Sequence, residues 1–136
     1  VDSARLAAEL DRHAAAAGRV LPVLLQVNLS AEPQKSGVDP GALPALLAAL
    51  GERAHLQAVG LMTMPAPDED PEAARTVFAR LRTLRDELRE APGGAALCEL
   101  SMGMSHDFEV AVEEGATWVR IGTDLFGPRP SDREEA

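Results

Sequence analysis

Two stretches in the last third of the chain place small, hydroxylated and glycine residues directly after short apolar runs. They are residues 100–107 (LSMGMSHD) and residues 119–127 (VRIGTDLFG). Backbone N–H groups lack partners where a strand ends or a helix begins, and small side chains let an anion approach them. One such stretch alone is more simply a turn or a helix cap. Two of them, separated by one predicted helix, favour a shared phosphate site.

An arginine lies inside the second stretch. Arg120 stands between Val119 and Ile121, in a run that reads as a buried strand. A buried guanidinium must be paired or must face a ligand. The residue pattern therefore leaves two alternatives open. Arg120 faces an anion or a heterocycle nitrogen, or it forms an internal ion pair with Glu99 or Asp124.

Other residues whose side chains could take part in binding or catalysis have simpler structural explanations. The chain has one lysine, Lys35, in a polar loop, and its type and setting indicate an exposed surface residue. Asp107 precedes an apolar helical run, which predicts an N-cap. His106 has no cysteine or second histidine near it, so we expect no metal site. Met62 ends an apolar run and is more typical of a core residue than of a ligand contact.

Apolar periodicity predicts an α/β chain. The pattern indicates helices at residues 3–17, 41–50, 71–90 and 107–114 and strands at residues 21–29, 56–64, 96–102 and 117–121. Strands that alternate with helices form a parallel sheet, and ligands of such sheets gather at the carboxyl ends of the strands. Four β/α units make half of an eight-stranded barrel or most of a small doubly wound sheet. Periodicity alone leaves that choice open.

Composition restricts the partners. The 136 residues carry a formal net charge of −9, which argues against nucleic acid and anionic membrane surfaces. A single cysteine, Cys98, excludes an internal disulfide, fits a reducing cytoplasm and reads as a small buried hydrophobe. No apolar run is long enough for a membrane span, and no signal peptide opens the chain.

Four segments carry a family resemblance. They are residues 23–37 (VLLQVNLSAEPQKSG), 60–67 (GLMTMPAP), 100–109 (LSMGMSHDFE) and 115–127 (GATWVRIGTDLFG). In order and spacing they closely resemble the pyridoxal phosphate homeostasis proteins (the YggS/PROSC type). The resemblance implies a (β/α)8 TIM barrel like the N-terminal domain of alanine racemase. It also implies a cytoplasmic, non-catalytic protein that binds pyridoxal 5′-phosphate (PLP), carries or buffers it, and serves PLP-dependent apoenzymes.

The same resemblance implies a set of cofactor-binding residues. They are Ser101, Arg120, Gly122, Thr123, Met62 and Asn28. Ser101, Gly122 and Thr123 would hold the phosphate, and Arg120 would approach the pyridine nitrogen. Met62 and Asn28 would line the pocket less specifically. No catalytic residue and no metal ligand is implied.

The chain departs from the family in what precedes its first helix. The family's Schiff-base lysine lies on an early strand in a segment resembling Ala-Val-Ser-Lys, and this sequence has no such segment. We therefore expect residues 1–127 to form the C-terminal, PLP-binding half of the barrel and residues 128–136 to form a polar tail. Lys35 remains the only side-chain amine.

A half-barrel leaves sheet edges open, so we expect self-association, pairing with a missing half, or low stability. Two alternatives remain open. One is a fragment of an alanine racemase-like PLP enzyme, which the lack of any tyrosine disfavours. The other is an unrelated phosphate-binding α/β module.

Overall fold

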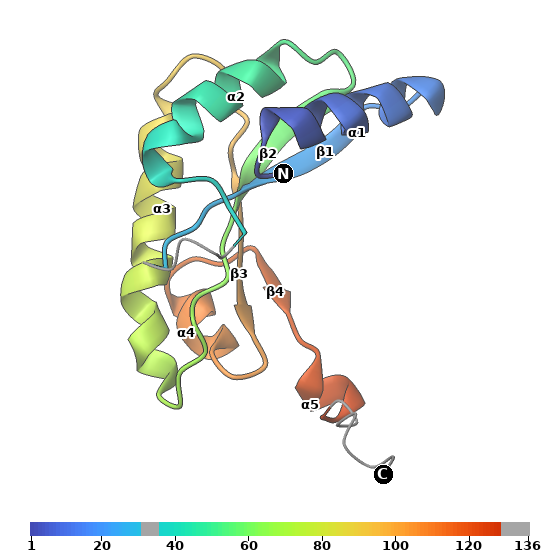
Figure 1. Cartoon of the computed structure of the whole chain (residues 1–136). Coiled ribbons are helices and arrows are strands. Elements are labelled where there is room, and N and C mark those ends of the chain that lie inside the picture. The colour runs from blue at the N-terminus through green and yellow to red at the C-terminus, as the bar shows by residue number, and fades with distance from the viewer. Residues whose placement is uncertain (31–35, 129–136) are drawn as a thin grey trace.

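The chain folds into alternating helices and strands. A computed structural model describes residues 1–30 and 36–128. Its elements, labelled in Figure 1 except for two short 3-10 helices, are α1 (Ala4–Ala16), β1 (Leu21–Gln26), η1 (Pro40–Ala42), α2 (Leu43–Gly51), β2 (Leu56–Met62), η2 (Pro71–Ala74), α3 (Arg75–Arg89), β3 (Glu99–Met104), α4 (Phe108–Glu113), β4 (Trp118–Arg120) and α5 (Thr123–Phe126). The predicted α/β order is confirmed, and each predicted strand is present with shifted ends.

The four strands form one parallel sheet in the order β1-β2-β3-β4. Helices α2, α3 and α4 lie on the same side of this sheet (Figure 1), where they pack against β2, β3 and β4. Neighbouring strands that follow the chain order, with helices on one side, are typical of a β/α barrel. A doubly wound sheet reverses its strand order and covers both faces. The structure therefore supports half of a (β/α)8 barrel, and β3 and β4, which carry the predicted site, are adjacent.

The core lies between the sheet and its helices. Alternate residues of β1 point toward the helices, so Val23 and Leu25 are buried while Leu24 and Gln26 are half-buried on the other face. Helix α3 contributes Phe78, which is fully buried. Residues of β1, β2 and β3, together with Val1, line a hollow of about 330 Å³. Its lining residues are Val1, Pro22, Val23, Leu24, Gln26, Met62 and Ser101.

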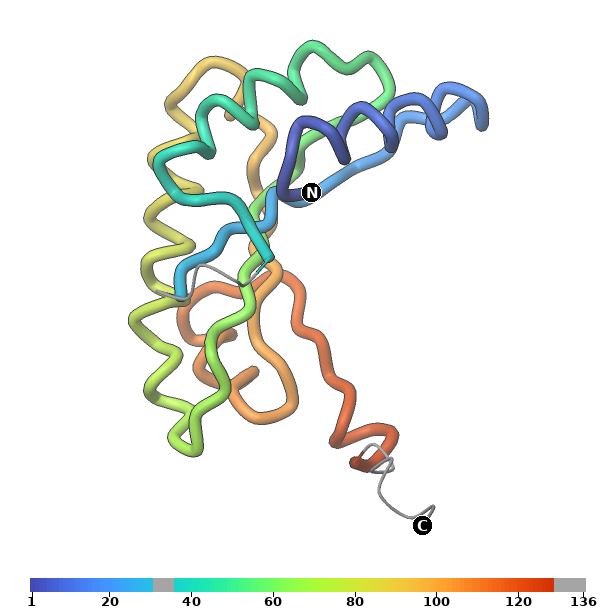
Figure 2. Tube along the Cα trace, in the orientation of Figure 1, coloured from blue at the N-terminus to red at the C-terminus, as the bar shows by residue number. Residues whose placement is uncertain are grey.

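The first residue lies against the outer edge of β1 (Figure 2). The Val1 amine donates to the Leu24 carbonyl at 2.7 Å, and the Val1 carbonyl accepts from the Gln26 N–H at 2.8 Å. These two bonds bracket Leu25 in the pattern of a parallel ladder. Val1 therefore blocks the edge of β1 at this point, whereas β4 forms the other edge.

Two burial predictions are wrong. The strand containing Arg120 was expected to be buried, but in β4 Trp118 is 61% exposed and Val119 is 37% exposed. Cys98 was expected to be a small buried hydrophobe, and it is exposed just before β3. The strand β4 is exposed because it is the last strand of the described sheet, so no further strand covers it. Cys98 lies one residue before β3 begins and is not part of that strand.

No helix in the described part of the chain is long and apolar enough to cross a membrane. Of the tail predicted at residues 128–136, residues 129–136 lie outside the described residues.

Candidate functional site

A β-bulge positions the two strands that carry the predicted site. Ser101 pairs with Trp118, but Met104 pairs with Arg120, so β3 has one extra residue between these pairs. Gly103 lies in this interval with φ +93, a backbone conformation that other residues rarely adopt. A Cβ there would also lie 2.6 Å from the Ala111 Cβ of α4. The sequence Met-Gly-Met thus brings β3 close to α4 and sets the register of Arg120.

Arg120 and Ser101 are in direct contact. Arg120 Nη1 donates to Ser101 Oγ at 2.5 Å, and Arg120 Nη2 donates to the Thr63 carbonyl at 3.0 Å. The guanidinium is half-buried and Ser101 is buried. The ion pair considered for Arg120 is not formed with Glu99, whose Oε2 accepts from the Trp118 indole N–H at 2.8 Å.

The charge of Arg120 is only partly compensated. Burial lowers its pKa below the ordinary arginine value, and the negative charge of Asp107 opposes that shift. Asp107 occupies the predicted N-cap position of α4, but its carboxylate makes no capping bond to the helix. Asp107 Oδ1 instead accepts from the Met104 N–H at 2.7 Å. The site therefore keeps a desolvated cation that an anionic group would stabilise.

Ser105 links the two stretches of small residues. Its hydroxyl oxygen accepts from the Gly122 N–H at 3.2 Å and from the Asp124 N–H at 3.3 Å. Gly122 and Thr123 are exposed where β4 runs into α5. The two stretches predicted to share one phosphate site therefore lie together, at the carboxyl ends of adjacent strands.

The other predicted site residues lie at different distances from this centre. Met62 pairs with Ser101 across β2 and β3 and lines the same hollow. Asn28 follows β1, where its Oδ1 accepts from the Ser30 N–H at 3.1 Å and from the Ser30 hydroxyl at 2.9 Å. No described contact joins Asn28 to Ser101 or Arg120. Lys35 lies outside the described residues.

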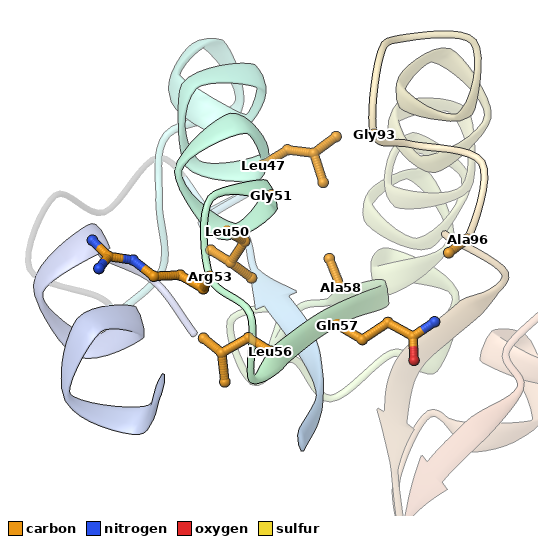
Figure 3. A pocket seen from close by; sticks show the side chains of 9 residues that line it. All are labelled: Leu47, Leu50, Gly51, Arg53, Leu56, Gln57, Ala58, Gly93 and Ala96. Atoms are coloured by element: carbon orange, nitrogen blue, oxygen red, sulfur yellow. The ribbon is translucent and has the colours of Figure 1, made fainter. Parts of the chain in front are cut away.

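A second cavity, of about 180 Å³, lies at the amino ends of the strands (Figure 3). Its lining is mostly apolar, including Leu47, Leu50 and Ala58. The Arg53 guanidinium points toward α1, away from the space between α2 and Ala96 (Figure 3). Ligands of parallel β/α folds gather at the opposite end of the strands, so this cavity is not the candidate site.

Sequence reasoning placed Thr63 and Ser105 among the residues at the carboxyl ends of the strands but gave neither of them a role in the site. Thr63 is 1% exposed and its carbonyl holds Arg120. Ser105 was noted only as one residue of a strand end, not as the link to Gly122. The signal for Thr63 was its place directly after an apolar strand, one residue beyond Met62. The site combines a guanidinium, a hydroxyl and main-chain N–H groups, which is the donor set of an anion site. Within the described residues no group of three or more His, Cys, Asp or Glu side chains could hold a metal ion.

The chain matches one family model. The family is described as "Alanine racemase, N-terminal domain", and residues 1–130 match it. A pyridoxal phosphate homeostasis protein of Aquifex aeolicus is 49% identical over 129 residues, which cover 95% of this chain and 56% of the relative. The Pseudomonas aeruginosa protein of the same name is 46% identical over 129 residues, covering 95% and 54%. The chain thus spans about half the length of these curated relatives.

Solved structures show the same relationship. PipY of Synechococcus elongatus with PLP bound superposes with a TM-score of 0.84 at 42% identity, covering 93% of this chain and 58% of PipY. An alanine racemase of Clostridium difficile in complex with cycloserine superposes with a TM-score of 0.71 at 21% identity, covering 97% and 36%. The second likeness concerns the fold alone.

Proposed function

The chain belongs to the family of alanine racemase N-terminal domains, and from this premise we propose that it binds pyridoxal 5′-phosphate at the carboxyl ends of β3 and β4. The observation that carries the proposal is the contact of Arg120 with Ser101 beside Ser105, which joins the two small-residue stretches. The names of the relatives and the PLP bound to PipY support the choice of ligand.

The residues present fit this ligand. A guanidinium only donates hydrogen bonds, so Ser101 Oγ is the acceptor toward Arg120 and its own proton remains for another acceptor. Ser101 and the Gly122–Thr123 segment would bind the phosphate, and Arg120 would lie toward the pyridine nitrogen. Met62 and Asn28 would border the ring and its substituents. When bound, PLP supplies an aldehyde and an electron-withdrawing ring.

We propose a non-catalytic role in PLP homeostasis, with PLP-dependent apoenzymes as recipients. An arginine beside the pyridine nitrogen keeps that nitrogen unprotonated, which weakens the ring as an electron sink. The chain also has no tyrosine, which an alanine racemase-like enzyme needs as a catalytic acid or base. The single cysteine supports a cytoplasmic setting.

The first test is PLP binding itself. Equilibrium dialysis is expected to show a complex from which inorganic phosphate displaces PLP. Ser101→Ala removes one hydroxyl donor and is expected to weaken PLP affinity by roughly three- to tenfold, with little change for pyridoxal, which has no phosphate. Borohydride reduction is expected to trap little covalent adduct, and Lys35→Ala to abolish what is trapped. Failure of the wild-type chain to retain PLP would overturn the proposal.

We also propose that the chain self-associates through the open edge at β4. Leu125 is 70% exposed and Phe126 is 86% exposed in α5, and Trp118 at the start of β4 is exposed as well. Exposed apolar groups of this size on an unpaired edge favour association. Sedimentation equilibrium is expected to show a dimer that Phe126→Ser weakens. A monomer at every concentration would contradict this proposal.

A further inference from the structure

Thr63 lies at the centre of a hydrogen-bond network that connects all four strands. It directly follows β2 and is 1% exposed. Its hydroxyl donates to the Val27 carbonyl after β1 at 2.9 Å, and its N–H donates to the Ser101 carbonyl of β3 at 3.2 Å. Its carbonyl accepts from Arg120 of β4 at 3.0 Å. Each polar group of Thr63 therefore bonds to a different strand.

Two acceptors on neighbouring strands define the plane of the Arg120 guanidinium. One is the Ser101 hydroxyl and the other is the Thr63 carbonyl. A guanidinium that bonds to two fixed acceptors loses most of its rotational freedom. If the Thr63 carbonyl moved, Arg120 would keep only its bond to a rotating hydroxyl. The position of Thr63 thus controls the orientation of Arg120.

The orientation of Arg120 in turn determines what Ser101 can do. Because Arg120 donates to Ser101 Oγ, the hydroxyl proton is left to point at a different acceptor. Ser101 lines the hollow of about 330 Å³ described above. The proton is therefore available to an acceptor oxygen in that hollow, as a phosphate oxygen of a ligand would be.

We propose that Thr63 is a positioning residue of the ligand site. Its carbonyl holds Arg120, which leaves the Ser101 hydroxyl as a donor to the phosphate. Its own hydroxyl ties this hydrogen-bond network to the end of β1. This inference rests on the proposed function for the identity of the ligand. The role assigned to Thr63 rests on the hydrogen bonds alone. Thr63 itself need not touch the ligand.

The test compares Thr63→Val, which keeps the shape and loses the hydroxyl, with Thr63→Ser, which keeps the hydroxyl. In nitrogen-15 NMR spectra of the unliganded chain, Arg120 is expected to show distinct Nη signals in the wild type and in Thr63→Ser, and averaged signals in Thr63→Val. PLP affinity is expected to fall by roughly three- to tenfold in Thr63→Val and to recover in Thr63→Ser. Pyridoxal affinity is expected to fall less than PLP affinity, because pyridoxal keeps the pyridine nitrogen toward which Arg120 would lie but has no phosphate.

Thr83→Val is the matched control. The Thr83 hydroxyl also bonds to a main-chain carbonyl, that of Ala79 at 3.0 Å, but on the exposed face of α3. It should leave both measurements unchanged. If Thr63→Val does not fold, Thr63→Cys replaces the hydroxyl with a weakly bonding thiol of similar size. Unchanged Arg120 signals in folded Thr63→Val or Thr63→Cys, which both lose the hydroxyl, would overturn the positioning role. Absence of PLP binding by the wild type would overturn the proposed function, while the Arg120 spectra would still decide the role of Thr63.

Discussion

Replacing Arg120 by methionine is expected to lower PLP affinity by roughly tenfold to a hundredfold. The substitution removes a charged donor that bonds to both Ser101 and Thr63. Ser101, which would bind the phosphate, then regains rotational freedom, and the pyridine nitrogen loses the guanidinium that would lie toward it. Fluorescence titration with PLP measures the change, and circular dichroism confirms that the variant is folded.

Two further variants test whether the loss of affinity is specific to the guanidinium at position 120. Arg120→Lys keeps the charge but cannot bond to both acceptors with a planar fork, so we expect it to recover only part of the affinity. Arg85 is the matched arginine: its Nη1 donates to the Cys98 carbonyl at 3.2 Å, at the amino end of β3. Arg85→Met should bind PLP as the wild type does. Equal losses in Arg85→Met and Arg120→Met would indicate a general effect of removing charge and would contradict the assigned site.

The parallel sheet was predictable because each strand is a short apolar run between an amphipathic helix and a loop with glycine or proline, whereas the choice of a barrel over a doubly wound sheet came from the family resemblance. That pattern permits a parallel sheet and little else. The position of the site followed from the same logic, since the carboxyl ends of adjacent parallel strands meet at one edge. The location of Ser101 and Gly122 at the carboxyl ends of neighbouring strands was predictable in this way. Their assignment to a particular ligand needed the family resemblance.

The partner of Arg120 was not predictable from residue types. A sequence argument seeks an acidic side chain for an arginine, but Arg120 bonds to a serine hydroxyl and to a main-chain carbonyl. Every residue has a main-chain carbonyl, so the sequence does not indicate which carbonyl accepts the hydrogen bond from Arg120. The one-residue bulge at Gly103, which sets the position of Arg120, also depends on how closely α4 packs.

The exposure of β4 was missed for a related reason. Trp118 and Val119 are apolar, and apolar strand residues are normally assigned to a core. Whether a side chain is buried also depends on the element that covers it, however, and the described sheet ends at β4. The same composition thus predicts a buried strand in a complete barrel and an exposed edge in half of one.

A large loss of stability is expected for Gly60→Ala in β2, which should lower the free energy of unfolding by about 3 kcal/mol. Gly60 pairs with Glu99 in the neighbouring strand, and a Cβ at this position would overlap the Glu99 carbonyl oxygen. A main-chain oxygen within a sheet cannot rotate away as a flexible side chain can, so the strands must separate. Urea denaturation followed by circular dichroism measures the change.

Gly51→Ala is the control that isolates this cause. Gly51 ends α2, and nothing lies within 4 Å of a Cβ built on it. The same substitution there should be neutral or stabilise by about 0.5–1 kcal/mol, because alanine restricts the unfolded chain more than glycine does. Because Met62 pairs with Ser101 two residues beyond Gly60, separation of β2 from β3 should also weaken PLP binding in Gly60→Ala. Equal stability of the two variants would show that β2 and β3 do not approach each other as closely as described.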